Sequence, residues 1–226
     1  VLWQDEYLAD HPEGLSYKRF CTRLNQFQAE TDPKLDYPKQ RKAGEVLESD
    51  WCGEVLAIVY DHDSKNFQKA HVLVTALGFS QKIFARAYPN EKQESWIDGH
   101  TKALEFYGGL PRIVKPDNAK TAIKKTNRYE PEKNPVFSRW AQHYNLAIIP
   151  ARVYKPKDKD RVEDAVGWVE KSIFPTLKEQ IFYSFNELNI VLLEEVEKLN
   201  NRPYQQRPGS RSTIYLQLDK PAMRPL

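Results

Sequence analysis

The chain has 226 residues, of which 40% are hydrophobic and 12% aromatic, enough for one sizeable packed domain and an appendage. Its 34 basic and 31 acidic residues give a net charge of +3, a balance that neither requires nor excludes a nucleic-acid partner. The sequence has no apolar run of the roughly 18 residues that cross a bilayer and no recognisable export signal at its start. We therefore expect a soluble, cytoplasmic globular protein with no membrane partner.

Cysteines and histidines show no pattern of a metal site. Cys21 and Cys52 could form at most one disulfide, and the five histidines fall at no zinc-ligand spacing with them. We expect two free, partly buried thiols. His100 and His143 lie beside aromatic residues on expected helices, so we interpret them as packed or surface residues.

The N-terminal part, residues 1–43, is predicted to be a helix followed by a linker. Within Leu8–Gln28, aromatic and aliphatic residues recur at helical spacing between basic ones. Thr31–Lys42 then contains two prolines and many charges, which is typical of an exposed linker.

From residue 44 the pattern changes to β-strands. Val46–Trp51, Glu54–Tyr60 and Ala70–Phe79 are rich in β-formers, and the polar DHDSKN turn joins the second to the third. Short links between three such runs predict an antiparallel meander. Asp50 stands out, because a carboxylate on a strand that otherwise reads as half or fully buried needs a partner, and a metal ion is a common one.

Helices and strands then alternate up to residue 175, which predicts parallel strands for this half. The resulting order, β-β-β-α-β-α-β-α, is that of a ribonuclease H-like α/β fold: a mixed five-stranded sheet with helices on both faces. The expected elements are a helix over Ser95–Tyr107 ended by Gly108-Gly109, a strand over Arg112–Lys115, a helix over Phe137–Tyr144, a strand over Leu146–Pro150 and a helix over Asp160–Phe174.

Residues 176–226 are expected to form a C-terminal helix and an extended arm. Asn186–Asn200 has an apolar stripe at helical spacing, whereas Arg202–Leu226 has four prolines and little periodicity. The chain begins without an obvious domain start, so we expect it to be a fragment of a longer protein.

Three acidic residues are predicted to meet in this fold. The first strand of such a sheet is central and the fourth lies beside it, which brings Asp50 near Asp117, just beyond the fourth strand. Glu163 lies in the first turn of the helix after the fifth strand and can project toward the same edge. Three carboxylates so placed would hold two Mg²⁺ ions, or Mn²⁺ as a substitute.

Each of these residues also has an ordinary structural interpretation. Asp50 could be a strand-end aspartate bonded to backbone donors, and Asp117 could belong to a simple turn. Glu163 could be a first-turn carboxylate favoured by the helix dipole, and Asp164 is its nearest rival.

Five segments together resemble the catalytic core of IstA-type DDE transposases, which is similar to that of retroviral integrases. They are GLSYKRFCTRL, ESDWCGE, PDNAKTAI, KDKDRVEDAVGWVEKSIF and NNRPYQQRPGSR with KPAMRPL. The resemblance implies a catalytic and metal-binding triad of Asp50 in SDW, Asp117 in PDN and Glu163 in RVED. It departs from the common family pattern at Pro116, Cys52 and Asp160.

The resemblance also implies an activity and partners. The activity is metal-dependent 3′-end cleavage of transposon DNA followed by strand transfer into target DNA. The partners are transposon-end and target DNA, further copies of the chain in a dimer or tetramer on paired ends, and an IstB-like AAA+ ATPase. The expected location is the bacterial cytoplasm, in association with the nucleoid.

Basic residues flank two of the acidic positions and are candidates for contacts with DNA phosphates. Solvated loops are an equally good interpretation. Two alternatives to a transposase also remain open: a nuclease of the same fold that does not join strands, and a catalytically silent DNA-binding or assembly module. The candidate DNA-binding residues are Lys120, Lys124, Lys125, Lys155, Lys157, Lys159 and Arg161.

Overall fold

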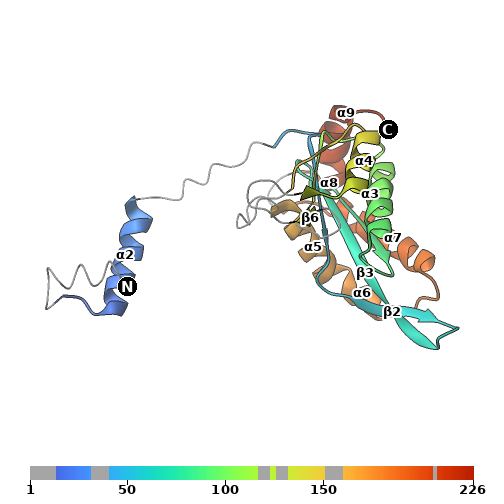
Figure 1. The fold of residues 1–226 in the computed structure, drawn as a ribbon, viewed down its shortest axis with the longest axis horizontal. Coiled ribbons are helices and arrows are strands. Elements are labelled where there is room, and N and C mark those ends of the chain that lie inside the picture. Colours follow the sequence, from blue (N-terminus) through green and yellow to red (C-terminus); the bar gives the residue numbers. More distant parts are fainter. Residues whose placement is uncertain (1–13, 32–40, 117–122, 126–131, 151–159, 206–207) are drawn as a thin grey trace. The chain divides into compact units, whose positions relative to one another are not determined.

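A computed structural model describes residues 14–31, 41–116, 123–125, 132–150, 160–205 and 208–226 (Figure 1). The chain divides into two compact units, Val1–Gln40 and Arg41–Leu226. In the first unit, helix α2 covers Tyr17–Thr31. It starts later than the helix expected from Leu8, because Gly14 disfavours a helix and Ser16 is a favourable residue to precede one.

The second unit contains a six-stranded mixed sheet. Strand β3 is its longest, and it pairs antiparallel with β2 along its first half and with β1 and β4 along its second half. Strand β1 pairs on its other edge with β5, in parallel, and β5 pairs in parallel with β8. The strands are β1 (Val46–Trp51), β2 (Leu56–Asp61), β3 (Asn66–Leu77), β4 (Ile83–Tyr88), β5 (Ile113–Pro116) and β8 (Ala147–Ile148).

The expected antiparallel start, parallel second half and central first strand are confirmed, but the expected count of five strands is one too few. The missing strand is β4, whose sequence IFARAY is buried at five of its six positions. Helices cover both of its faces, so it lacks the apolar–polar alternation that marks a half-buried strand.

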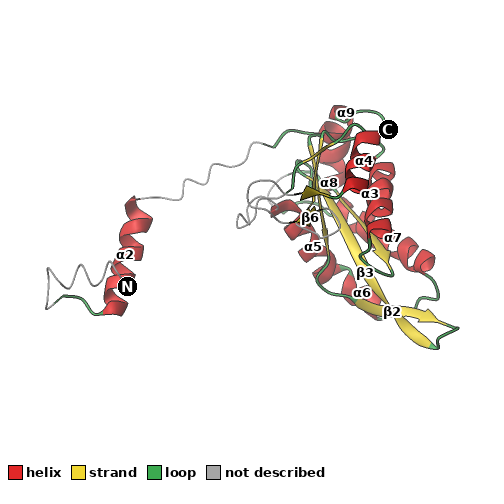
Figure 2. Ribbon diagram, in the orientation of Figure 1, coloured by secondary structure: helices red, strands yellow, loops and turns green. Residues whose placement is uncertain are grey.

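Helices pack on both faces of the sheet, as expected for the ribonuclease H-like class (Figure 2). Two of them bury aromatic side chains against one face, together with Leu73 and Val114. Three others bury mainly aliphatic side chains, and Phe174 of α6, against the opposite face, together with Val72 and Val74. The first pair is α3 (Gln93–Tyr107) and α4 (Pro135–His143); the second group is α5 (Asp160–Ser172), α6 (Phe174–Lys178) and α7 (Phe185–Asn201).

Helix ends follow ordinary capping chemistry. The side chain of Asn134 accepts the N–H of Val136 at the start of α4, and that of Ser184 accepts the N–H of Glu187 at the start of α7. Helix α3 ends as predicted at Gly108, which has a left-handed conformation (φ 59°).

Helix α7 also covers the outer edge of β4. The amide of Asn200 both accepts the N–H and donates to the carbonyl of Ile83, and Asn189 does the same for Ala87. Backbone groups of an edge strand are thereby satisfied without a neighbouring strand.

The expectation of an extended C-terminal arm is wrong for residues 208–226. This segment folds into α8 (Arg211–Ile214), the π-helical turn η2 (Tyr215–Asp219) and α9 (Lys220–Ala222). Tyr215 and Met223 are buried in the aromatic core on the α3 face. Pro221 lies in the first turn of α9, where a proline is compatible with a helix, and contacts distant in sequence hold the segment in place.

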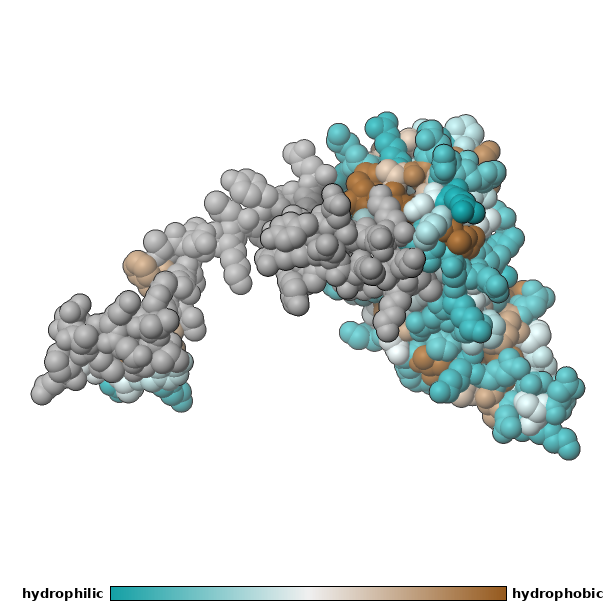
Figure 3. Space-filling model, in the orientation of Figure 1, coloured by the Kyte–Doolittle hydropathy of each residue, from teal (hydrophilic) through white to brown (hydrophobic). Residues whose placement is uncertain are grey.

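A small ribbon, β6 (Ile123–Lys125) with β7 (Glu132–Lys133), completes the described elements. The surface seen in Figure 3 is mostly hydrophilic, with hydrophobic residues in scattered patches. No helix in the described ranges is both long enough and apolar enough to span a bilayer.

Candidate active site

Asp50 lies near the C-terminal end of β1, half-buried, with its side chain on the α5 face of the sheet. Its partner on β3 is Val74, which belongs to the core beneath α5. One carboxylate oxygen accepts the N–H of Trp51 (2.9 Å). The sequence-based placement of a carboxylate on a largely buried central strand is thus confirmed.

The parallel register of β1 and β5 places the end of β5 beside the end of β1 that carries Asp50. Ser49 pairs with Pro116, the residue directly before Asp117. Asp117 itself lies outside the described residues. Within those residues, no three His, Cys, Asp or Glu side chains form a group that could hold a metal ion.

Glu163 lies in the first turn of α5 and is exposed, as is its rival Asp164. Partial desolvation by its surroundings raises the pKa of the exposed Asp164, and the negative charges of Asp160 and Glu163 act in the same direction. The positive charge of Arg161 opposes this shift. The start of α5 therefore has three carboxylates near one another in the chain, and Asp160 among them is paired with Arg41.

Glu48 is a buried carboxylate that the sequence analysis did not single out. Oε2 accepts the N–H of Val162 in the first turn of α5 (3.1 Å), and Oε1 accepts from Nη1 of Arg41 (3.1 Å). Burial raises the pKa of this carboxyl, against the lowering effect of Arg41. The signal in the sequence was an acidic residue two positions before Asp50, on the same face of a largely buried strand.

Arg41 also forms an ion pair with Asp160, the first residue of α5. Asp160 is one of the three positions at which the chain departs from the common pattern of IstA-type transposases, where glycine is usual. Here its ion pair with Arg41 stabilises the start of α5. The guanidinium of Arg41 thus lies between a carboxylate on β1 and one on α5.

The opposite face of β1 is supported by α3. Nε2 of His100 lies 2.9 Å from the hydroxyl of Ser49, and Nδ1 lies 2.8 Å from the carbonyl oxygen of Trp96. Burial lowers the pKa of His100 to about 4, so the ring is neutral at pH 7. Nδ1 then donates to the carbonyl of Trp96 and Nε2 accepts from Ser49, and the expectation that His100 is a packed residue is confirmed.

Both cysteines are free, as expected. Cys52, two residues after Asp50, is buried in the core under α5, and burial raises the pKa of its thiol. A thiol held in its neutral form in an apolar setting packs as a small hydrophobic residue.

The candidate DNA-binding residues are only partly described. Arg161 is half-buried beside Asp164. The backbones of Lys124 and Lys125 form part of β6. The remaining candidates lie outside the described residues: Lys120, Lys155, Lys157 and Lys159.

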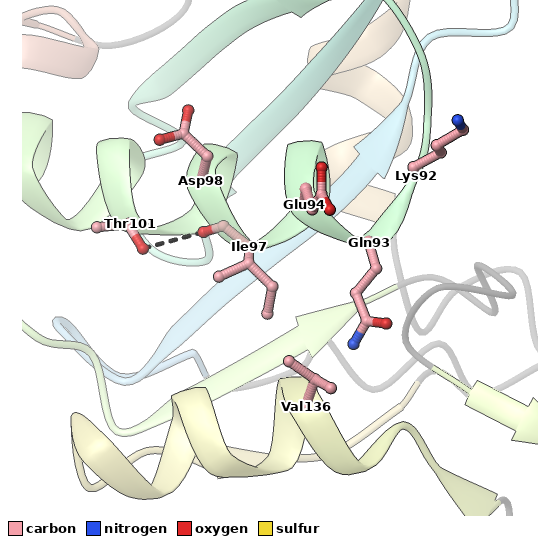
Figure 4. Close-up of a pocket in the computed structure, with 7 residues that line it drawn as sticks. All are labelled: Lys92, Gln93, Glu94, Ile97, Asp98, Thr101 and Val136. Atoms are coloured by element: carbon pink, nitrogen blue, oxygen red, sulfur yellow. Dashed lines mark hydrogen bonds between the residues drawn. The ribbon is translucent and has the colours of Figure 1, made fainter.

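A shallow hollow of about 620 Å³ lies on the opposite side of the sheet from Asp50. Figure 4 shows it between the first turns of α3 and the start of α4, with Lys92, Glu94 and Thr101 on the α3 side and Val136 on α4. It contains no member of the proposed triad, so it is separate from the candidate active site.

Residues 40–156, just over half of the chain, match the family described as integrase core domain. The Sinorhizobium fredii protein y4bL/y4kJ/y4tB, a candidate transposase by name, is 35% identical over 226 residues, which is 100% of this chain and 43% of that protein. The transposase for insertion sequence element IS21 of Pseudomonas aeruginosa is 27% identical over 172 residues, 74% of this chain and 42% of that protein. The chain thus spans less than half the length of these relatives.

Solved structures support the fold independently. The HTLV-2 integrase catalytic core domain, in complex with magnesium, has a TM-score of 0.55 at 14% identity and covers 77% of this chain and 97% of its own. The BIV integrase catalytic core domain has a TM-score of 0.55 at 12% identity, with coverages of 77% and 95%. The ribonuclease H-like class expected from the order of elements is therefore confirmed.

Proposed function

Since this chain belongs to the integrase core domain family, we propose that it is the catalytic core of an IstA-type DDE transposase. Its reaction is metal-dependent cleavage at the 3′ ends of transposon DNA, followed by transfer of those ends into target DNA. Relatives named as transposases match the whole chain or most of it, and the fold is that of integrase cores.

The observation that carries this proposal is the convergence of three elements at the end of β1. Pro116 of β5 pairs with Ser49, and the bond from Val162 N–H to Glu48 fixes the first turn of α5 over the α5 face of β1. The proposal takes Asp117, the residue after Pro116, as the ligand contributed next to Asp50. Neighbouring strands lie about 4.8 Å apart, which is close enough for carboxylates on both to share a metal ion.

The proposed ligands are Asp50, Asp117 and Glu163. Their oxygens suit Mg²⁺, or Mn²⁺ in its place, and the half-buried position of Asp50 on the α5 face is compatible with such a site. Two bound ions would stabilise the entering and leaving oxygens of an in-line phosphoryl displacement. The side chains only hold and orient, so the reaction needs no protein nucleophile.

Basic residues around the triad would bind the DNA backbone. The proposed contacts are those of Lys120, Lys124 and Lys125 after Asp117, and of Lys155, Lys157, Lys159 and Arg161 before Glu163. Each contact releases counterions from the phosphates, so binding should weaken steeply with salt.

The proposed partners follow from the same family assignment. A dimer or tetramer would hold paired transposon ends, and an IstB-like AAA+ ATPase would be its partner in the cytoplasm, at the nucleoid.

The test is a strand-transfer assay of the full-length protein with pre-cut transposon-end DNA, target DNA and Mn²⁺. Joined product that is lost in Asp117→Asn supports the transposase. Cleavage without joining indicates a nuclease of the same fold. Binding of end DNA with neither reaction indicates a silent DNA-binding or assembly module.

A further inference from the structure

Glu48 lies in the middle of β1 with a side chain that is 2% exposed. Residues two apart on a strand point to the same face, so Glu48 shares the α5 side with Asp50. A carboxylate at this depth is costly to desolvate unless donors surround it. Its donors therefore indicate what it does.

The groups around Glu48 come from the elements that carry the proposed triad. Oε2 accepts the N–H of Val162, next to Glu163 in the chain (3.1 Å). On the other side of β1, Lys115 is the register partner of Glu48 and lies two residues before Asp117. The side chain of Glu48 thus joins β1 to the start of α5. It lies on β1 beside β5, the strand that ends just before Asp117.

Arg41 completes this arrangement. Its guanidinium donates to Oε1 of Glu48 (3.1 Å) and pairs with Asp160 at the first residue of α5. The amide donors at a helix start have no partners within the helix, and a carboxylate placed there is electrostatically favoured. Glu48 satisfies one of these donors from outside the helix and so fixes the height of the first turn over the sheet.

We propose that Glu48 is a positioning residue that holds the first turn of α5 at the height and rotation that bring Glu163 to the metal ligands on β1 and β5. The inference rests on the proposed function, because it takes Asp50, Asp117 and Glu163 as the ligands. Glu48 itself does not touch the metal or the DNA; it acts through the Val162 amide and the Arg41–Asp160 pair.

The experiment compares Glu48→Ala and Glu48→Gln with wild type in the full-length protein. Mn²⁺ binding is followed by the electron paramagnetic resonance signal of the free ion, and local order by amide hydrogen exchange of the first turn of α5. Removal of a residue that orients a ligand typically weakens metal binding by about 10- to 100-fold. We expect Glu48→Ala to raise the Mn²⁺ Kd at least about tenfold and to speed exchange in the first turn. Glu48→Gln should give an intermediate Kd, because its carbonyl oxygen can still accept the Val162 N–H.

Glu170→Ala is the matched control. Glu170 is also on α5 and also links the helix to the chain beyond β1, since its Oε1 accepts the N–H of Glu54 (3.1 Å), but it lies in the last turns of the helix. We expect its Mn²⁺ Kd to stay within about twofold of wild type, because the first turn keeps its anchor.

Two results would overturn the positioning role: an unchanged Mn²⁺ Kd in Glu48→Ala, or an equal rise in Glu170→Ala. If Glu48→Ala fails to fold, the Mn²⁺ Kd of Glu48→Gln is the test. A Kd equal to that of wild type then contradicts the positioning role. Asp50→Asn separates this inference from the proposed function. Loss of Mn²⁺ binding in Asp50→Asn with no effect at Glu48 refutes only the positioning role. Normal Mn²⁺ binding and joining in Asp50→Asn refutes the proposed ligand set, and a wild-type protein that joins no DNA refutes the function itself.

Discussion

His100 of α3 accepts a hydrogen bond from the hydroxyl of Ser49 (2.9 Å), the residue directly before Asp50 on β1. On the α3 face of the sheet, the neutral, buried imidazole of His100 thus holds the end of β1 that carries the proposed ligand. On the α5 face, Glu48 holds the first turn of α5. Both sides of β1 are fixed by polar contacts within two residues of Asp50. Such support favours a site whose geometry exists before metal and DNA bind.

The buried imidazole predicts a loss of stability in acid. The pKa of His100 is about 4 in the folded protein and about 6.5 when unfolded, so the unfolded state takes up a proton first as the pH falls. The contribution of His100 to the free energy of unfolding should therefore fall by about 3 kcal/mol between pH 6.5 and pH 4. Urea unfolding at a series of pH values measures it.

His100→Gln separates this effect from the titration of carboxylates. The stability difference between wild type and His100→Gln should shrink by about 3 kcal/mol from pH 7 to pH 4, because the variant has no ring to protonate. His143→Gln, at an exposed position, should keep the wild-type pH dependence. Parallel curves for wild type and His100→Gln would contradict the buried neutral ring.

Regular elements with local signals could be predicted from the sequence. Helix α3 has an apolar stripe and Gly108 at its end, and the order of elements places β1 beside β5. β4 lacked a signal, because burial on both faces removes the alternation that identifies a strand. The prolines of the C-terminal segment predict an extended arm, but Asp219 anchors the segment to Gly44, 175 residues earlier in the chain, a contact that no local pattern encodes.

The candidate site likewise contains residues that the sequence predicts and residues that only the tertiary structure reveals. The motif around Asp50 identified the residue, and alternation along a strand gives the face on which it lies. The role of Glu48 depends on Val162, 114 residues later, and on the docking angle of α5. Residue type and spacing can therefore nominate ligands, but the residues that orient those ligands emerge only from tertiary packing.

Asp50→Asn should remove strand transfer while leaving the fold intact. The amide has no negative charge for a divalent ion, so we expect joining to fall by about a thousandfold or more, equivalent to about 4 kcal/mol in the barrier. The melting temperature should change little, because Asp50 is half-buried at a strand end and its isostere can still accept the Trp51 N–H. Gel-based joining assays and thermal unfolding measure the two effects.

Asp63→Asn provides the comparison for Asp50→Asn. Asp63 is an exposed residue of the turn between β2 and β3, so its substitution should change neither property. If Asp50→Asn retains strand transfer, Asp50 is not a catalytic metal ligand and the proposed site is wrong at its central residue.

Charge reversal at Lys120 and Lys124 should weaken DNA binding and its salt dependence. Each lost phosphate contact lowers the slope of log K against log salt by about 0.9, so Lys120→Glu with Lys124→Glu should reduce the slope by about 2. Fluorescence anisotropy with end DNA at several salt concentrations measures it. Lys198→Glu, at an exposed site on α7, should leave the slope unchanged. An unchanged slope in the double variant would show that these lysines are only solvated.

Asp219→Ala should destabilise the whole second unit, because the C-terminal segment is part of its core. One carboxylate oxygen accepts the N–H of Gly44 at the entrance to β1 (2.7 Å), and the other accepts that of Ser80 between β3 and β4 (2.9 Å). Removing both acceptors leaves two buried donors unsatisfied, which should cost about 2–4 kcal/mol of unfolding free energy. Lys220→Ala, at the exposed neighbouring position, should cost less than about 0.5 kcal/mol. Chemical denaturation compares the two variants, and equal stabilities would mean that the segment is a dispensable arm, as its proline content first suggested.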